Sequence, residues 1–139
     1  MKKNESIAKV MTSAPASVSR NQPVSAARRI LEEKGVHHLP VTDGDQLVGM
    51  LTSNDLLRVS FGEFGSQDGR SLDAILDHTY TISDLMSANP TTVNRDQTVR
   101  DAATILAGSG FHSLPVVDGS ALIGIVTSSD LLHYLVEQY

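Results

Sequence analysis

The sequence of 139 residues contains no cysteine. Without thiols the chain can form neither a disulfide bond nor a thiolate metal site. Basic residues are also few, because 11 Lys and Arg stand against 16 Asp and Glu and leave a net charge of −5. Binding to nucleic acid normally leaves a basic footprint, so we expect no nucleic-acid partner.

Long apolar runs are missing too, since no stretch approaches the roughly 18 apolar residues of a membrane span. Residues 1–5 (MKKNE) are charged, and no apolar segment of a secretory signal follows them. Hydrophobic residues make up 40% of the chain and charged residues 19%, which is typical of a globular protein. We therefore expect a folded, cytoplasmic protein without a membrane partner.

What the sequence does contain is an internal repeat. Residues 7–58 recur without a gap at residues 82–133, and 24 of these 52 aligned pairs are identical when counted along the sequence. Repeats are sought first because overlooking one leads to the wrong fold. We therefore divide the chain into a first repeat (1–60), a linker (61–80) and a second repeat (81–139).

Each repeat begins with a short helical turn, for which Ser6 in the first repeat and either Thr81 or Ser83 in the second are suitable N-caps. A longer helix follows, because apolar residues recur at helical spacing from Val24 and again from Val99. The residues expected to cap these helices are Asn21 and Asp96 at the start and Gly35 and Gly110 at the end.

Two strands and a second helix complete each repeat. Pro40 lacks an N–H donor, which predicts that its strand lies at a sheet edge or starts at the proline. Asp-Gly pairs at 43–44 and 118–119 are typical of hairpin turns, and the apolar runs that follow predict buried strands. The order β-α-β-β-α in each repeat predicts an α+β fold.

The linker has the composition of a loop around Gly62, Gly65 and Gly69. Leu72, Ile75 and Leu76 have the spacing of one short helix beyond it.

The sequence carries none of the common catalytic motifs. It has no G-x-S-x-G, no H-E-x-x-H, no G-x-G-x-x-G and no P-loop, and no two of its five histidines have the i, i+4 spacing of a helical metal pair. We therefore expect no catalytic residues, no metal site and no enzymatic activity.

One motif does recur in both copies at the end of a buried strand. It reads Gly-apolar-apolar-Thr-Ser-x-Asp, from Gly49 to Asp55 and from Gly124 to Asp130. Free N–H groups at the start of a helix suit a phosphate, and a carboxylate one turn further accepts from a ribose diol. The motif therefore suggests a site for a nucleoside phosphate.

A purely structural interpretation of the same residues stays open. Thr-x-x-Asp is close to a capping box, in which Thr52 and Thr127 cap a helix and Asp55 and Asp130 reach back to a backbone N–H. His37, His38 and His112 are candidates for phosphate contacts or for exposed histidines with backbone partners. Ala27 and Ala102 suit either the core or the surface beside an adenine.

These residues resemble the cystathionine β-synthase (CBS) domain in its tandem form, the Bateman module. The features that carry the resemblance are residues 36–41 (VHHLPV) with 52–55 (TSND), and residues 111–116 (FHSLPV) with 127–130 (TSSD). The match covers about 52 residues in each copy. Order, spacing and duplication together make it specific.

The resemblance implies two β-α-β-β-α repeats packed about a pseudo-twofold axis, with clefts between them, and a homodimer of two chains. It also implies a sensor that binds an adenosine-containing ligand and signals to an unknown effector protein. AMP is the first candidate, and ADP, ATP, NAD or S-adenosylmethionine are further ones, with Mg²⁺ accompanying the nucleotide in some members. No other cofactor is required, and because the repeats fill the chain we expect a stand-alone module.

Residue by residue, the resemblance implies that Asp55 and Asp130 hold the ribose diol and that hydroxyls and histidines lie near ribose and phosphate. It implies an adenine wall that each cleft takes from the opposite repeat. The remaining implied ligand-binding residues are Thr52, Thr127, Ser129, His37, His38 and His112 near the phosphate, and Val36, Phe111, Ala27, Ala102, Gln22 and Gln97 near the adenine.

The sequence departs from the AMP-activated kinase gamma subunit in this family, which has arginine after the histidine. His38 and Ser113 stand there instead, which favours a ligand with few phosphates such as a monophosphate. Val36 against Phe111 predicts two unequal sites. The competing hypothesis is a ligand-free dimerisation scaffold.

Overall fold

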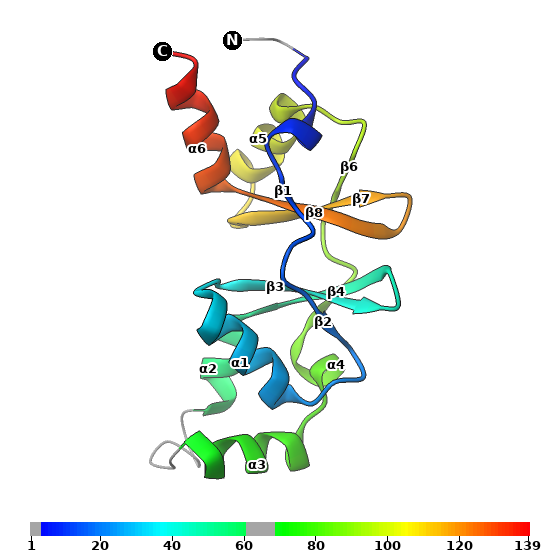
Figure 1. Ribbon diagram of the computed structural model, residues 1–139, viewed down its shortest axis with the longest axis vertical. Coiled ribbons are helices and arrows are strands. Elements are labelled where there is room, and N and C mark those ends of the chain that lie inside the picture. The colour runs from blue at the N-terminus through cyan, green and yellow to red at the C-terminus, as the bar shows by residue number, and fades with distance from the viewer. Residues whose placement is uncertain (1–3, 61–68) are drawn as a thin grey trace. The chain divides into compact units, whose positions relative to one another are not determined.

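The computed structural model describes residues 4–60 and 69–139, without the side chains of 69–71, and is shown in Figure 1. The chain forms two compact units. Unit 1 comprises Met1–Pro15 and Pro90–Tyr139, and unit 2 comprises Ala16–Asn89. The first residues of each repeat therefore belong to the unit that contains the main part of the other repeat.

Unit 2 is built on strands β2 to β5. β2 (Val18–Ser19) runs parallel to β3 (His38–Asp43), while β3 and β5 (Ser87–Ala88) pair antiparallel with β4 (Gln46–Thr52). The helices of this unit are α1 (Val24–Lys34), α2 (Ser53–Ser60), α3 (Gly69–Thr79) and α4 (Ile82–Leu85).

Unit 1 repeats this arrangement. β6 (Val93–Asn94) runs parallel to β7 (Ser113–Asp118), while β7 and β1 (Thr12–Ser13) pair antiparallel with β8 (Ala121–Thr127). Its helices are the 3-10 turn η1 (Ile7–Lys9), α5 (Val99–Ala107) and α6 (Ser128–Glu137). Both units thus have the predicted β-α-β-β-α order, and the α+β fold class is confirmed.

Each unit has its own hydrophobic core, which is completed by the first residues of the other repeat. We call these residues, 4–15 of the first repeat and 81–89 of the second, the leading segments. Ile7 is fully buried among residues of the second repeat in unit 1, and Ile82 is fully buried among residues of the first repeat in unit 2. Ser6 and Thr81 cap the turns that carry these isoleucines, as predicted.

The strand glycines receive these leading segments. A methyl group added to Gly124 would overlap the Met11 side chain and lie 3.0 Å from the Thr12 carbonyl oxygen. Gly49 has the same relation to Met86 and to the Ser87 carbonyl oxygen, again at 3.0 Å. In this structure, the close approach that glycine permits is therefore used by another segment of the chain.

The predicted N-caps of the first helices are wrong by two residues. α1 has Pro23 and α5 has Thr98 at the N-cap position, rather than Asn21 and Asp96. Thr98 forms a reciprocal capping box with Asp101, which explains the later start of α5. Pro23 has no side-chain acceptor for the first N–H groups of α1, so another residue must supply one.

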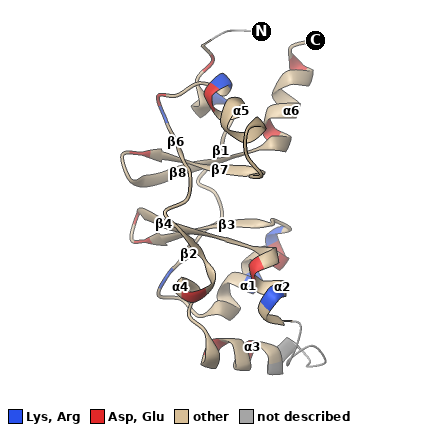
Figure 2. Cartoon of the chain, turned by 180° about the vertical axis from the view of Figure 1, so that it is seen from behind, with Lys and Arg blue, Asp and Glu red and all other residues tan. Residues whose placement is uncertain are grey.

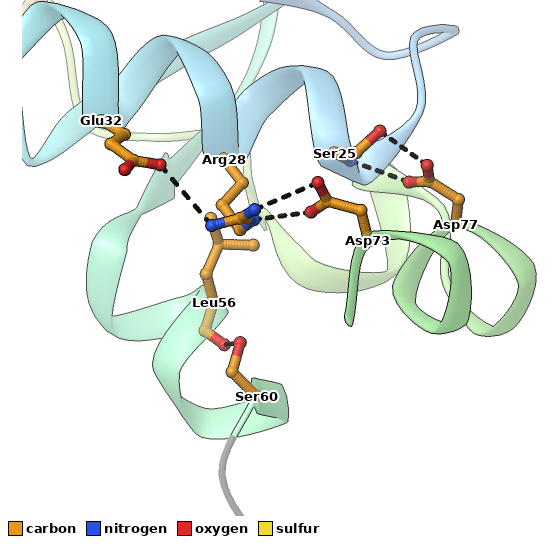
Figure 3. Close-up of polar contacts among 7 residues, drawn as sticks. All are labelled: Ser25, Arg28, Glu32, Leu56, Ser60, Asp73 and Asp77. Atoms are coloured by element: carbon orange, nitrogen blue, oxygen red, sulfur yellow. Dashed lines mark hydrogen bonds and ion pairs between the residues drawn. The ribbon is translucent and has the colours of Figure 1, made fainter. Parts of the chain in front are cut away.

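Asp77 of α3 supplies that acceptor. Its carboxylate accepts from the Ser25 backbone N–H at 2.8 Å and from the Ser25 hydroxyl at 2.6 Å (Figure 3). One helical turn along each helix, Asp73 forms a two-bond ion pair with Arg28 at 2.6 and 3.0 Å. These contacts hold α3 against α1.

The helix predicted around Leu72, Ile75 and Leu76 is confirmed as α3, in which Leu76 is fully buried. Gly62 and Gly65 of the predicted loop lie outside the described residues, and Gly69 begins α3. None of the described helices is long and apolar enough to cross a membrane.

The two helix-ending glycines behave differently. Gly35 ends α1 with a left-handed φ of 63°, as predicted. In the second repeat α5 already ends at Ala107, and the C-cap is Gly108 rather than the predicted Gly110. Glycine is a poor helix former, which accounts for the shorter helix.

The predicted edge position of the Pro40 strand is only partly correct. β3 pairs with β4 on one side and with β2 on the other, but β2 contacts only Val41 and Thr42. Pro40 lies just before this short pairing, so its missing N–H donor interrupts no bond to β2. The predicted hairpin turns are present, with Gly44 and Gly119 at φ of 65° and 67°.

Candidate functional site

The recurring Thr-Ser-x-Asp motif lies where the second strand of each hairpin becomes a helix, at the end of β4 in unit 2 and of β8 in unit 1. In unit 1, the Thr127 hydroxyl accepts from the Asp130 N–H at 3.0 Å, and Asp130 Oδ2 accepts from the Thr127 N–H at 2.9 Å. This is the capping box that the structural interpretation predicted. It uses one carboxylate oxygen of Asp130, and the described residues provide no hydrogen-bond partner for the other, Oδ1.

Unit 2 has the same strand-to-helix junction with two additional contacts. Asp55 Oδ2 accepts from the Thr52 N–H at 2.8 Å and from the Thr52 hydroxyl at 3.0 Å, while the Asp55 N–H donates to that hydroxyl. Asp55 Oδ1 is held by Arg58, one helical turn further along α2. Arg58 was not predicted from the sequence, although the i, i+3 spacing of Asp and Arg could have indicated it.

The first N–H groups of these helices are mostly engaged. Ser53 and Ser128 donate to the backbone carbonyls of His37 and His112, each at 3.0 Å. The third N–H of each helix is used by the capping threonine. Among the described contacts, the Asn54 and Ser129 N–H groups have no protein partner and are left for a ligand or for water.

The candidate histidines border this junction. His37 and His112 are exposed, and His37 Nδ1 lies 3.3 Å from the Ser53 hydroxyl. His38 is the first residue of β3 and is half-buried, whereas its counterpart Ser113 is buried in β7. The structure therefore places His37 beside the motif in unit 2 and links His112 to it through its backbone.

The residues proposed for the adenine wall differ in exposure. Ala27 and Ala102 are fully buried within the cores of their units. Val36 is half-buried and packs against the core of unit 2, while the Phe111 side chain is 50% exposed. Val36 and Phe111 thus offer surface that the alanines do not.

Gln22 and Gln97 stabilise the turns that precede α1 and α5, respectively. Gln22 Oε1 accepts from the Ser19 N–H, and Gln97 Oε1 accepts from the Asn94 N–H, both at 2.8 Å. Their side-chain oxygens are therefore engaged within the chain. Among the described residues, no three His, Asp or Glu side chains gather in a way that could hold a metal ion.

Two β-α-β-β-α units, each with a hydroxyl and a carboxylate at the start of the helix that follows its hairpin, define a tandem α+β repeat module. The family profile described as "CBS domain" matches residues 7–62 and 82–137. The chain belongs to the CBS domain family.

Two curated relatives differ in how much of their length the chain spans. It is 36% identical over 117 residues to the inosine-5'-monophosphate dehydrogenase of Korarchaeum cryptofilum, covering 84% of this chain but only 21% of that enzyme. It is 29% identical over 126 residues to the CBS domain-containing protein YhcV of Bacillus subtilis, covering 91% of this chain and 82% of YhcV.

A solved structure of similar fold is that of CBSX2, a CBS-pair protein from Arabidopsis thaliana. It matches with a TM-score of 0.82 and 28% identity over 98% of this chain and 97% of that one. CBSX2 in complex with AMP matches with a TM-score of 0.79 and 30% identity, over 96% and 98% of the two chains.

Proposed function

We propose that the chain is a regulatory module that binds an adenosine-containing nucleotide, AMP first, and signals its presence to a separate effector protein. The observation that carries this proposal is Asp130, whose Oδ2 caps α6 while its Oδ1 has no partner among the described residues. The similarity to CBSX2, which has been solved with AMP, supports the choice of ligand.

Capping and ligand binding are compatible at Asp130 because they use different oxygens. Oδ1 can accept from a ribose hydroxyl without disturbing the cap, as acidic residues do in dinucleotide folds. Ser129 offers both its hydroxyl and its unengaged N–H to a phosphate, where the helix dipole favours negative charge. Thr127 completes this site in unit 1. The corresponding residues in unit 2 are Thr52, Asn54 and Asp55.

A monophosphate fits these junctions better than a triphosphate. The histidine is followed by His38 in one repeat and by the buried Ser113 in the other, so neither position supplies an arginine. We assign the adenine contacts first to Val36 and Phe111, since Ala27 and Ala102 are fully buried.

The experiment is thermal unfolding with AMP, ADP, ATP, NAD and S-adenosylmethionine in turn. A ligand at about 100 times its Kd adds about 2.7 kcal/mol to the free energy of unfolding. We expect the largest shift with AMP, and a smaller one in Asp130→Ala. No shift with any of the five at millimolar concentration would contradict the proposal.

Asp101→Ala is the matched control for Asp130→Ala. Thr98 and Asp101 form the same capping box on α5, with distances of 3.1 and 2.9 Å. Loss of either cap costs about 1 kcal/mol. We expect both variants to lose stability without ligand, but only Asp130→Ala to lose part of the AMP shift. An equal loss of that shift in both would mean that Asp130 serves only as a cap.

The apolar surface of α6 favours a second role, formation of a homodimer. Leu132, Leu135 and Val136 follow the i, i+3, i+4 spacing of one face of α6 and are exposed, with Val136 at 70%. Tyr139, which is also exposed, follows the end of this helix. α6 contains acidic residues but neither Lys nor Arg (Figure 2). Such a stripe typically marks a protein interface.

A second copy of the chain suits this stripe. His133 and Glu137 lie one helical turn apart and flank the same side of the stripe. If two α6 helices cross antiparallel about a twofold axis, His133 of each copy faces Glu137 of the other. A ring N–H of His133 in one copy can then donate to the Glu137 carboxylate of the other, in the position of the flanking polar pairs of coiled coils.

We expect Leu132→Glu with Val136→Glu to give a monomer in analytical ultracentrifugation, where the unmodified chain is a dimer. Leu57→Glu, at the equivalent of Leu132 on α2, is the control and should leave the dimer intact. An unchanged mass in the α6 double variant would contradict the α6 interface. A stable dimer that binds none of the nucleotides would favour the scaffold function instead.

A further inference from the structure

The two ribose-binding candidates differ in the state of one oxygen atom. Asp55 Oδ1 is paired with the guanidinium of Arg58, and Asp55 Oδ2 is occupied by Thr52. Asp130 Oδ2 accepts from the Thr127 N–H, but among the described residues Oδ1 has no hydrogen-bond partner. The first carboxylate is therefore fully engaged and the second is half-engaged.

The difference follows from one substitution between the repeats. Adding 75 to Arg58 gives His133, which is shorter and forms no ion pair with Asp130 among the described contacts. The neighbouring residues Asp55-Leu56-Leu57 and Asp130-Leu131-Leu132 are identical in type. Position 58 or 133 thus sets how accessible the carboxylate is.

Arg58 lies on the solvent side of its partner. Its side chain is 72% exposed, whereas that of Asp55 is only 11% exposed. A diol that approaches Asp55 Oδ1 has to displace this cation, because a carboxylate oxygen already bonded to a guanidinium is a weaker acceptor for hydroxyls. Because the exposed Arg58 side chain can move aside, it competes with the diol for Asp55 Oδ1 and does not block the site permanently.

We propose that Arg58 makes the two nucleotide sites unequal, so that the site at Asp130 fills before the site at Asp55. Arg58 acts through Asp55 and is a positioning residue for that site. This inference rests on the proposed nucleotide binding. An exposed ion pair is worth up to about 1 kcal/mol, which corresponds to about a fivefold difference in Kd.

The test exchanges the two residues in backgrounds that contain a single site. In Asp130→Ala, only the site at Asp55 remains, and adding Arg58→His should tighten AMP binding about fivefold in isothermal titration calorimetry. In Asp55→Ala, only the site at Asp130 remains, and adding His133→Arg should weaken AMP binding by a similar factor. Circular dichroism verifies the fold of each variant.

Two controls separate competition at Asp55 from other effects. Arg29→His removes the same charge from the exposed surface of α1 and should leave both affinities unchanged. Arg58→Lys keeps a cation and should retain part of the competition. The gain from Arg58→His should also shrink as salt is raised, because salt screens an exposed ion pair.

Weaker or unchanged AMP binding on adding Arg58→His in the Asp130→Ala background would overturn the inference. The first of these results would mean that Arg58 contacts the phosphate. If the folded unmodified chain binds no AMP at all, the proposed function fails and this inference fails with it. If it binds AMP equally at both sites, only this inference fails.

Discussion

At the scale of single residues, the same pair of side chains serves in several places. Thr52 with Asp55, Thr81 with Asp84, Thr98 with Asp101 and Thr127 with Asp130 exchange the same reciprocal hydrogen bonds at the start of a helix. The pair by itself therefore marks only a helix start. The two candidate sites are distinguished by the buried strand that leads into them.

Asp84 makes one of these caps sensitive to acid. Hydrogen bonds from the Thr81 backbone N–H and then from its hydroxyl lower the pKa of Asp84 below the ordinary 3.8. The ionised form is favoured in the folded state, so its contribution to stability is present above pH 3.8 and is lost as pH falls through the lower folded pKa.

We expect Asp84→Asn to lower the denaturation midpoint at pH 7 and to have a smaller effect near pH 3, because the stabilisation from the ionised carboxylate declines below pH 3.8. Urea unfolding at the two pH values measures this. Glu33→Gln, an exposed change on α1, serves as the control. A loss for Asp84→Asn that stays equal at both pH values would contradict the assigned role of charge.

Tyr134 presents the opposite case, a polar group without a partner. Its hydroxyl oxygen is buried and has no hydrogen-bond partner among the described residues. This burial raises the pKa of Tyr134 above 10, and the negative charge of Glu5 raises it further. The neutral form is favoured on folding, so stability is kept below pH 10 and falls as pH rises through the folded pKa.

Removing that hydroxyl should therefore do no harm. We expect Tyr134→Phe to leave the free energy of unfolding at pH 7 unchanged or to raise it slightly, because an unpaired hydroxyl oxygen shielded from solvent is costly. Above pH 10 the variant should resist unfolding better than the native chain. Thermal unfolding at pH 7 and 10.5 measures both effects, with the exposed Tyr139→Phe as control. A clear loss at pH 7 would show that the hydroxyl has a partner such as water.

At the scale of elements, α1 and α3 depend on each other. α1 begins at a proline N-cap that provides no acceptor, and Asp77 of α3 provides it. The sequence predicted both helices from their apolar spacing. It did not predict their contact, because Ser25 and Asp77 are 52 positions apart and a capping residue is normally sought nearby.

The ion pair between Arg28 and Asp73 should be stronger than the surface pairs of the chain. Its side chains are 30% and 27% exposed, against 45% and 47% for Arg20 and Asp43. The hydrogen bond from Arg28 to Asp73 is the main reason that the pKa of Arg28 is raised.

We expect a double-mutant cycle of Arg28→Ala and Asp73→Ala to give a coupling energy of about 1–2 kcal/mol, since the pair forms two hydrogen bonds and is partly shielded. The cycle of Arg20→Ala and Asp43→Ala should give less than about 1 kcal/mol. Urea unfolding provides all the values. Equal coupling in the two cycles would contradict the difference in shielding.

At the scale of the whole molecule, the compact units are not the same pieces of chain as the sequence repeats. Unit 2 is continuous and holds all the core residues of its cluster, from Val18 to Ile82. Unit 1 is discontinuous, because its core includes Ile7, which lies far from residues 90–139 in the sequence.

This division predicts how fragments behave. We expect residues 16–89 to fold alone and residues 90–139 to stay unfolded, because the second fragment lacks Ile7 and the β1 strand. Removing a buried isoleucine side chain typically costs about 2–5 kcal/mol, a large part of the stability of a small domain. Circular dichroism and two-dimensional NMR of each fragment measure the outcome.

A peptide of residues 4–15, added to the fragment of residues 90–139, should restore its folded spectrum. The same peptide with Ile7→Ala should restore less. A folded 90–139 fragment without any peptide would contradict the dependence of unit 1 on the leading segment.

Much of this protein is determined by its sequence alone. Capping residues, hairpin glycines and apolar spacing act over a few residues, so the order of the elements, the α+β class and the Thr-Ser-x-Asp junctions could be predicted. The wrong helix caps at Asn21, Asp96 and Gly110 were each displaced by only two residues. Neighbouring residues, Thr98 and Gly108, cap α5, whereas the distant Asp77 supplies the acceptor at the start of α1.

The assignment of the leading segments was decided only by the tertiary structure. Ile7 and Ile82 are identical in type, as are Met11 and Met86 and the strand glycines Gly49 and Gly124. Either segment is therefore chemically suited to either core, and no local pattern distinguishes the two. The i, i+3 spacing of Asp55 and Arg58 can be read from the sequence, but only the folded structure decides whether the Arg58 side chain turns toward Oδ1 or into solvent.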